Sequence, residues 1–352
     1  MIYILFSVFI VLYIAKFFKW NNKKDDKILI DNLSDREEVI NDEIDVIITW
    51  VDSSDSKWIE LKEYYKNNSF KLCDSSDKRF PNKIFSSTEL YFCVSSISKY
   101  MPWVRNIFIL TGFNQKPEWV DQFPNVKIID HTKVIPNEYL PTFNSRAIEC
   151  FLHRIPNLSE KFIYFNDDFY VVKYLKKNFF FKNNFPITTG KLRELPFYYR
   201  SNFLRNILKK FYSNFTLFRQ EKKVIILGNI LNYELLDKNK VVSPSHVALP
   251  LTKEIMKYIN KEFRNNVEIT CRSKFRSVDS LRVTYLAANI TKYISKYGGD
   301  KKVMSMIGIK NLNQAKDQKL ICINDVHENS SFKKLIDFFD KNHGIKHYNK
   351  KE

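Results

Sequence analysis

Residues 140–170 read LPTFNSRAIECFLHRIPNLSEKFIYFNDDFY, and the fold prediction starts from this stretch. A helical pattern over 145–153 is followed by an apolar run, Phe162–Phe165, with the character of a buried strand. The letters NDD, residues 166–168, come directly after that run. Ligands of α/β proteins bind at the carboxyl ends of strands, and two adjacent carboxylates there favour a divalent cation. The alternative is a solvated acidic turn after a buried strand.

Short apolar runs alternate with helical patterns along most of the chain. This alternation predicts an α/β fold in which a mostly parallel sheet carries helices on both faces. Residues 171–241 predict little, and the aromatic cluster at 176–185 is interpreted as structural packing. We expect strands at 45–49, 106–111, 126–129, 162–165 and 320–324, and helices at 57–66, 89–99, 145–153, 246–263, 279–296 and 331–339.

The composition narrows the possible functions. Hydrophobic residues make up 44% of the 352 residues and aromatic residues 15%, which predicts an ordered core. The seven glycines form neither GxGxxG nor GxxxxGK[ST], which argues against dinucleotide-binding and P-loop proteins. The net charge of +18 favours anionic partners, although lysines spread along the chain are typical of a solvated surface. No zinc-finger, homeodomain or RNA-binding signature is present, so we expect no nucleic-acid partner.

The five cysteines are odd in number, widely spaced and without a CxxC pair. This pattern predicts neither a zinc site nor a disulfide framework. Cys93 and Cys150 lie in apolar helical patterns, so we expect both to be packing residues.

The amino-terminal segment predicts a membrane anchor. Residues 2–18, IYILFSVFIVLYIAKFF, are interrupted only by Ser7 and Lys16. A helix of this length spans about 25 Å, close to the ~30 Å of a hydrocarbon core, so a single-pass anchor over 1–19 is expected. A cleaved signal peptide is the alternative. Lysines after the span favour a domain on the cytoplasmic face, whereas a eukaryotic-like protein would have it in the Golgi lumen.

Four blocks of sequence resemble the Stealth family of sugar-1-phosphate transferases. The first two contain IDVIITWVDSSDSKW (44–58), ELYFCVSSISKYMPWVRNIFILTGFNQKPEWV (89–120), NVKIIDHTKVIP (125–136) and the opening stretch. SHVALPLTKEIMKYINKEF with KFRSVDSL resembles the third block, and ICINDVHENSSFKKLIDFF resembles the fourth. The family includes bacterial capsule polymerases and the N-acetylglucosamine-1-phosphotransferase that marks lysosomal enzymes. The resemblance implies a catalytic domain over 44–340, with blocks at 44–58, 86–182, 243–296 and 318–340, after a polar tether (20–43) and before a basic tail (341–352).

The resemblance also implies a Rossmann-like, GT-A-like core that binds a nucleotide-sugar. The implied reaction transfers a sugar-1-phosphate from a nucleoside diphosphate sugar to a hydroxyl of a glycan or glycoprotein acceptor, and it releases nucleoside monophosphate. Asp167 and Asp168 match the family's acidic pair and would hold Mg²⁺, Mn²⁺ or Ca²⁺. Two alternatives stay open: a metal-dependent nucleotide-sugar glycosyltransferase, and a non-catalytic, membrane-tethered module that binds polyanions.

Further roles follow from matching motif positions. His246 is implied as the general base and Arg276 as a ligand of the donor phosphates, with Asp168 as the third catalytic residue. A histidine at a helix start is alternatively structural. Implied substrate-binding residues are Asp52, Asn144, Ser145, Asp279, Asn324 and Asp325.

Several of these residues have simpler explanations. Asp52 is alternatively the first residue of an Asx-turn, where Ser53 stands in place of the family's usual glycine. Asn144 or Ser145 is alternatively the cap of the following helix. Asp279 would either orient Arg276 or cap the next helix.

Overall fold

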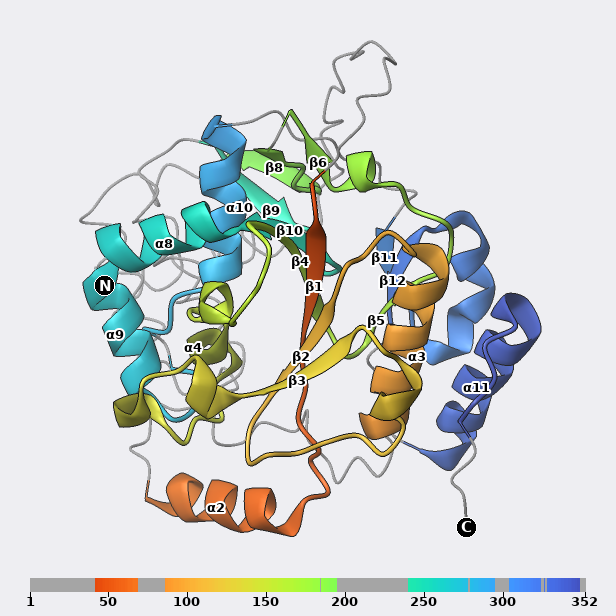
Figure 1. The fold of residues 1–352 in the computed structure, drawn as a ribbon, viewed down its shortest axis with the longest axis horizontal. Coiled ribbons are helices and arrows are strands. Elements are labelled where there is room, and N and C mark those ends of the chain that lie inside the picture. The colour runs from red at the N-terminus through yellow and green to blue at the C-terminus, as the bar shows by residue number, and fades with distance from the viewer. Residues whose placement is uncertain are drawn as a thin grey trace, which may run out of the picture.

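We describe the fold from a computed structural model of the chain. Its described residues are 42–68, 86–183, 185–194, 240–277, 279–294, 304–323, 326 and 328–348. They form a central sheet that is flanked by helices, with smaller sheets beside it (Figure 1). This is the α/β arrangement that alternating strands and helices predict.

Five strands form the central sheet in the order β10-β4-β1-β2-β3. β1 to β4 run parallel, and β10 joins the edge antiparallel to β4. β1, β2 and β4 are short runs rich in Ile, Val and Phe, which is typical of parallel strands that are covered on both faces. The bounds are Ile44–Thr49 (β1), Ile107–Thr111 (β2), Val126–Asp130 (β3), Lys161–Asn166 (β4) and Leu249–Thr252 (β10).

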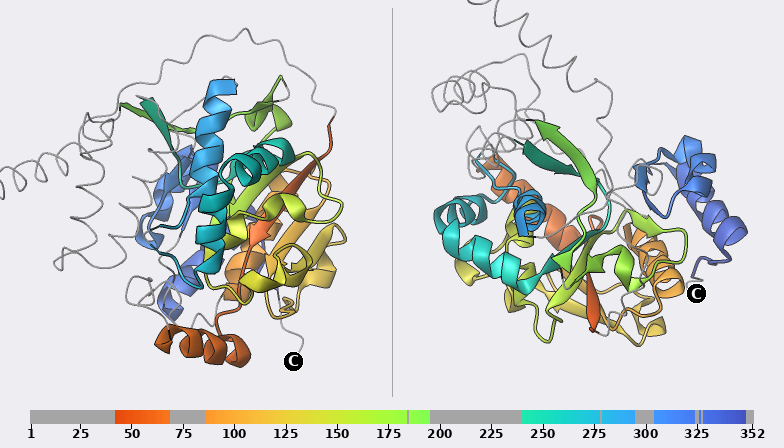
Figure 2. Two further views of the ribbon diagram at one scale, coloured as in Figure 1. Left: turned by 90° about the vertical axis from the view of Figure 1, so that its left-hand side faces the viewer. Right: turned by 90° about the horizontal axis from the view of Figure 1, so that it is seen from above.

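Helices cover both faces of this sheet. α3, with α11 beyond it, lies on one side, and α4, α8, α9 and α10 lie on the other (Figure 1 and Figure 2). The helices span Ser56–Asn67 (α2), Ser86–Tyr100 (α3), Ser145–Glu149 (α4), Lys253–Glu262 (α8), Arg264–Arg272 (α9), Val283–Ile294 (α10) and Asn329–His343 (α11).

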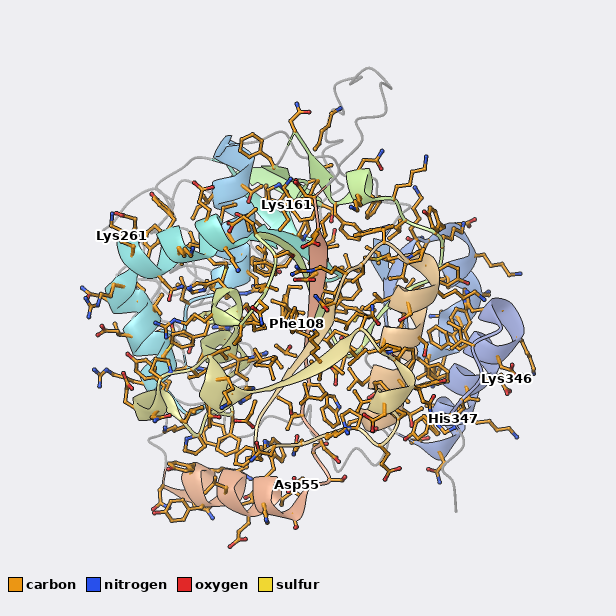
Figure 3. All side chains as sticks on the ribbon, viewed as in Figure 1. Asp55, Phe108, Lys161, Lys261, Lys346 and His347 are labelled. Atoms are coloured by element: carbon orange, nitrogen blue, oxygen red, sulfur yellow. The ribbon has the colours of Figure 1, made fainter. Side chains whose placement is uncertain are left out.

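Side chains fill the space on both sides of the sheet (Figure 3). Phe108 of β2 is 1% exposed and belongs to the core that includes α4 and α8. Its neighbours Ile107 and Ile109 belong to the core that includes α3 and α11. Because successive strand residues point to opposite faces, a slip of one residue would exchange the two sets. The double burial therefore specifies the register, and with it the side chains that reach the carboxyl edge.

A second sheet continues from β4. Only Asp167 and Asp168 separate β4 from β5, which pairs antiparallel with β12, and β12 pairs parallel with β11. The acidic pair therefore lies at the junction of two sheets. The remaining described strands are β5 (Phe169–Val171), β11 (Met304–Met306), β12 (Leu320–Cys322), and two antiparallel pairs, β6 (Phe181–Lys182) with β7 (Phe185–Pro186) and β8 (Gly190–Glu194) with β9 (Lys240–Pro244).

The first four predicted strands are confirmed to within one residue at each end. The predicted helix over 246–263 is wrong in its first part, because β10 occupies Leu249–Thr252 and α8 begins only at Lys253. Pro250 is tolerated in β10 because this strand lies at the edge of the sheet. The Thr252 hydroxyl then caps α8 by accepting the amide hydrogen of Ile255 at 3.2 Å.

The predicted membrane anchor requires a correction. Within the residues that the structure describes, no helix is both long enough and apolar enough to cross a bilayer. The single-pass transmembrane helix and the membrane localisation inferred from it are therefore not retained. Residues 2–18, on which that prediction rested, lie outside the described residues.

Candidate active site

The acidic pair is held by backbone hydrogen bonds on both sides. β1 pairs with β4 along its whole length, up to Thr49 beside Asn166, and β10 pairs with Lys161–Tyr164 on the other side, so the carboxyl end of β4 is fixed. Past the pair, the Asp168 carbonyl accepts the amide hydrogen of Ile323 at 3.0 Å, which ties the turn to the end of β12. Asp167 and Asp168 are half-buried. Two carboxylates are thus placed at the carboxyl edge of a parallel sheet, where α/β proteins bind ligands.

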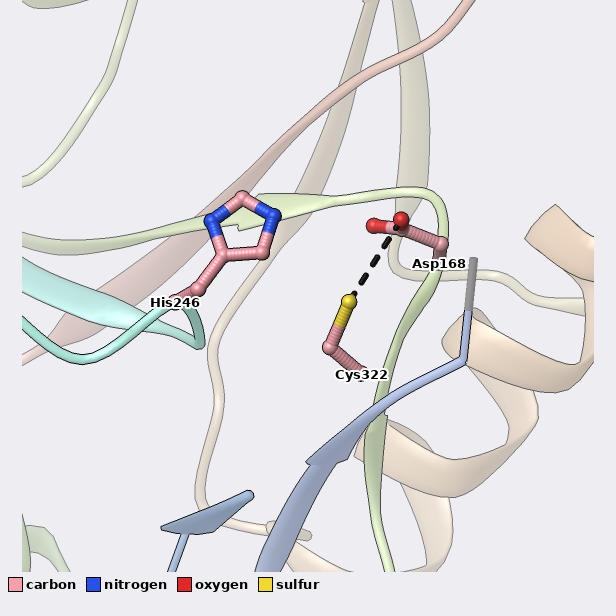
Figure 4. A group of neighbouring side chains, drawn as sticks. All are labelled: Asp168, His246 and Cys322. Atoms are coloured by element: carbon pink, nitrogen blue, oxygen red, sulfur yellow. Dashed lines mark hydrogen bonds between the residues drawn. The ribbon is translucent and has the colours of Figure 1, made fainter. Parts of the chain in front are cut away.

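Asp168 lies beside two residues from distant parts of the chain (Figure 4). One ligand atom each of Asp168, His246 and Cys322 lies within 4.8 Å of the others. The Cys322 thiol donates to Asp168 Oδ2 at 3.5 Å. The His246 ring meets the Phe169 ring edge-on, with centroids 5.2 Å apart. Strand pairing and the loop between β9 and β10 therefore bring the predicted base and a predicted metal ligand together.

The surroundings of His246 favour its neutral form. Solvent reaches its ring, yet the surrounding protein lowers its pKa, and the positive charges of Arg282 and Arg276 lower it further. An imidazole with a pKa below its ordinary value keeps a free lone pair at neutral pH. Burial first, and the two arginines after it, therefore favour the form of His246 that can accept a proton.

Arg276 is anchored by the start of α4. Its Nε donates to Ser145 Oγ at 3.1 Å, and an Nη atom donates to the same oxygen. The guanidinium is half-buried, and its charge acts on both His246 and Glu149. A planar, fixed guanidinium is suited to the oxygens of a phosphate.

Glu149, at the end of α4, was not predicted as a site residue. Its carboxylate accepts the Thr284 hydroxyl at 3.1 Å. Burial raises its pKa, which the charges of Arg276, Arg146 and Arg282 partly offset. An acid between apolar Ile148 and Cys150 is the sequence signal that marks this position, because helix faces that pack on a sheet seldom carry a charge.

Cys322 is the second residue that was not predicted for the site. Burial raises its thiol pKa, and so does the negative charge of Asp168. Its chemistry depends on β12 pairing with β5, since 154 residues separate it from Asp168. No local pattern indicates such a contact. Cys93 and Cys150 are buried free thiols, as predicted.

The hydrogen bonds of Asn144 and Asp52 match the simpler explanations. Asn144 is 0% exposed, and its side chain caps α4 by accepting the Arg146 amide hydrogen at 3.1 Å. Its amide group donates to the Thr270 and Ser273 carbonyls. Asp52 lies past the end of β1, where its Oδ1 accepts from the Ser54 amide at 2.9 Å and hydroxyl at 2.6 Å. This is the Asx-turn.

The other predicted substrate ligands are placed less completely. Asp279 is exposed, and α10 begins only at Val283, so Asp279 does not cap that helix. Asn324 and Asp325 lie outside the described residues. Substrate contact by these residues stays a prediction.

Comparisons with known proteins confirm the family resemblance of the first two blocks. Family models described as Stealth protein conserved region 1 and conserved region 2 match residues 42–69 and 83–188. The capsular polysaccharide phosphotransferase fcs1 of Haemophilus influenzae is 33% identical over 85% of this chain and 81% of its own length. The corresponding WcwK of Streptococcus pneumoniae is 29% identical over 85% of this chain and 94% of its own length.

Shorter matches are closer in sequence. The capsular polysaccharide phosphotransferase cps1A of Actinobacillus pleuropneumoniae is 47% identical, over 46% of this chain and 43% of its own length. A solved galactosyltransferase, LgtC in complex with donor and acceptor sugar analogs, covers 87% of this chain and 98% of its own with 9% identity and a TM-score of 0.42, too low to establish a common fold. The sequence relationship is the informative one: the chain belongs to the Stealth family and is a phosphotransferase.

Proposed function

We propose that this phosphotransferase moves a sugar-1-phosphate from a nucleoside diphosphate sugar to a hydroxyl of a glycan, in the synthesis of a capsular polysaccharide. One observation supports it above the others: an acidic pair, a neutral imidazole and an anchored guanidinium gather at one sheet edge. The names of the relatives, capsular polysaccharide phosphotransferases, indicate the same class of reaction.

In the proposed reaction the acceptor hydroxyl attacks the phosphorus atom next to the sugar. The new oxygen–phosphorus bond forms while the bond from that phosphorus to the bridging oxygen breaks. Nucleoside monophosphate leaves with the bridging oxygen, and the bond between the sugar and its phosphate stays intact. His246 takes the hydroxyl proton, and Arg276, positioned by Ser145, binds the phosphate oxygens.

The donor atoms at this edge fit a divalent cation. Asp167 and Asp168 offer carboxylate oxygens, the preferred ligands of Mg²⁺ and Mn²⁺, and His246 and Cys322 lie within reach of Asp168. We propose that the acidic pair holds the ion. When bound, the ion would neutralise negative charge on the donor diphosphate.

The test is product analysis on the full chain with a panel of nucleoside diphosphate sugars, Mg²⁺ and glycan acceptors. We expect release of nucleoside monophosphate, and we expect Asp168→Asn to lower turnover at least ~100-fold because a charged group at the reacting centre is lost. Asp121→Asn is the matched control, since Asp121 is exposed and pairs only with surface Lys116 among the described residues.

Two outcomes would replace the proposal. Release of nucleoside diphosphate with formation of a glycoside would indicate an ordinary glycosyltransferase. Unchanged function in Asp168→Asn, combined with loss of function in added salt, would indicate a polyanion-binding module.

A further inference from the structure

A basic hollow lies between α11, the 3₁₀ segment Ile309–Asp317 and the end of β5. Its volume is about 690 Å³, within the range of ligand sites. Val172, Ile309 and Phe338 are buried side chains that belong to its lining. Exposed lysines from all three elements surround this apolar base.

The charges of the hollow are almost all positive. Its lining includes Lys173, Lys310, Lys316, Lys334 and Lys341, all exposed. Asp337 is the one acid among the described residues that line it, and its carboxylate lies 3.6 Å from Lys341 Nζ, one helical turn away on α11.

This local excess differs from the charge pattern elsewhere on the surface. On α8, the three lysines Lys253, Lys257 and Lys261 are mixed with two acids, Glu254 and Glu262. Such mixing is typical of a solvated helix face. In the hollow, by contrast, five lysines from three separate chain segments converge around one acid. Mutual repulsion of these ammonium groups is relieved when an anion binds among them.

The hollow lies at the far end of the sheet that holds the candidate active site. β5 and β12 pair Cys322 with Phe169 at the Asp168 end and Leu320 with Val171 at the other end. The Val172 amide then donates to the Lys319 carbonyl at 3.0 Å, at the edge of the hollow. The five residue-to-residue steps from Asp168 to Lys173 span at most about 18 Å.

We infer that the hollow is a second binding site for the phosphodiester-linked glycan, separate from the site of transfer. The inference rests on the proposed function, because that reaction produces a polymer with a negative charge at each linkage. Spaced lysines suit such a chain by neutralising its phosphates, and buried apolar side chains lie beneath them. A chain held here would keep a long acceptor close to the catalytic edge.

Two other polyanions fit less well. A bilayer surface is flat, whereas these lysines surround a recess. Single-stranded nucleic acid is bound by stacking on exposed aromatic rings, and Phe338 in the lining is only 8% exposed.

The experiment compares two triple variants of the full chain. One changes Lys310, Lys316 and Lys334 to Gln. The control changes three exposed lysines of α2 and α8, on other sides of the molecule (Figure 1), to Gln: Lys57, Lys257 and Lys261. Both remove the same charge from solvent-exposed positions, and an unfolding midpoint checks that each remains folded.

The probe is a long poly(glycerol phosphate), with uncharged dextran, anionic phospholipid vesicles and single-stranded DNA as the other arms. We expect the hollow variant to bind the polymer at least about 10-fold more weakly, with a salt dependence shallower by up to about 2 in log–log slope. The control variant and a Lys→Arg version of the hollow should bind as the wild type does. In turnover assays, KM should rise for long acceptors and not for short ones.

Equal weakening in the hollow and control variants would overturn the inference, because general surface charge would then explain the binding. Preferential binding of vesicles or DNA over the polymer would overturn it as well. Polymer binding is measured in the Asp168→Asn background too, where turnover is not required. If wild type released no nucleoside monophosphate from any donor while polymer binding was lost only in the hollow variant, the site would be supported and the proposed reaction refuted.

Discussion

Each end of the central strands has a carboxylate shielded from water, and the protein shifts the pKa values of these two carboxylates in opposite directions. At the amino end, Asp45 of β1 is 0% exposed, and Arg105 binds it through Nε at 2.9 Å and an Nη atom at 2.6 Å. The Ser159 and Asn106 amides donate to the same carboxylate. Burial favours a higher pKa, but these bonds outweigh it and lower the pKa of Asp45.

At the carboxyl end, the effect of burial on the carboxyl pKa outweighs that of the partner groups. Burial raises the pKa of Glu149, and the nearby arginines offset the shift only in part. The first carboxylate is better stabilised in the folded protein than in water, and the second is worse. A carboxylate whose hydrogen bonds and ion pairs outweigh the cost of burial stabilises the fold. A carboxylate whose partners do not outweigh that cost is typical of a functional site, where a ligand can supply the missing interactions.

Asp45→Asn should produce the largest loss of stability. Arg105 would lose the charge of its partner, and breaking a buried pair typically costs 3–5 kcal/mol. Because Arg105 is about one-third exposed, we expect the lower end, about 3 kcal/mol, in urea unfolding. Turnover per folded molecule should stay within about 2-fold of wild type, since the residue lies at the opposite edge from the site.

Asp121→Asn is the control, because its exposed pair with Lys116 should contribute less than ~1 kcal/mol. Equal effects of the two variants would mean that the Asp45 network does not stabilise the fold in the way the comparison requires.

Glu149→Gln should keep its stability and lose turnover, the reverse of Asp45→Asn. The amide can keep the hydrogen bond with Thr284 and removes a carboxylate that burial disfavours, so stability should hold or increase. The negative charge that acts on Arg276 is lost, and we expect kcat/KM to fall about 100-fold because the electrostatics around that guanidinium change. Paired turnover and urea measurements check this. A large loss of stability with normal turnover per folded molecule would assign Glu149 to the structural class of Asp45.

The carboxyl edge could be predicted only where its signals are local. β4 and the acidic pair follow from an apolar run that ends in two carboxylates, and the structure extends that strand by one residue at each end. His246 and Arg276 were named from the family resemblance, not from any spacing. Glu149 had a usable signal, an acid in an apolar helical run, although it belongs to none of the motifs that carry the family resemblance.

The second sheet was beyond the reach of local patterns. β5, β11 and β12 have three residues each, too few to show the alternation of apolar and polar residues that predicts a strand. The strand expected at 320–324 exists as β12 (Leu320–Cys322), yet nothing near it indicates that Cys322 meets Asp168. Such short strands form because their partners are already in place, so their pairing is a property of the tertiary fold.

The smallest expected effect is in mild acid, where the contributions of Asp45 and Glu149 to the free energy of unfolding change in opposite directions. The Asp45 carboxyl has a lowered folded-state pKa, so its stabilisation is present above its unfolded value of about 3.8 and is lost as pH falls through the folded value. Glu149 has a raised folded-state pKa, so its destabilisation is relieved as pH falls through that value toward 4.5.

Unfolding free energies of wild type, Asp45→Asn and Glu149→Gln, measured in urea from pH 7 to pH 3, separate the two contributions. The advantage of wild type over Asp45→Asn should shrink only below about pH 4, where the unfolded carboxyl begins to hold its proton. Any advantage of Glu149→Gln over wild type should shrink earlier, above pH 4.5, because the native carboxyl takes up its proton first. If both differences moved in the same direction relative to wild type, the two ends of the sheet would not differ in how they hold charge, and the contrast between a structural and a catalytic carboxylate would fail.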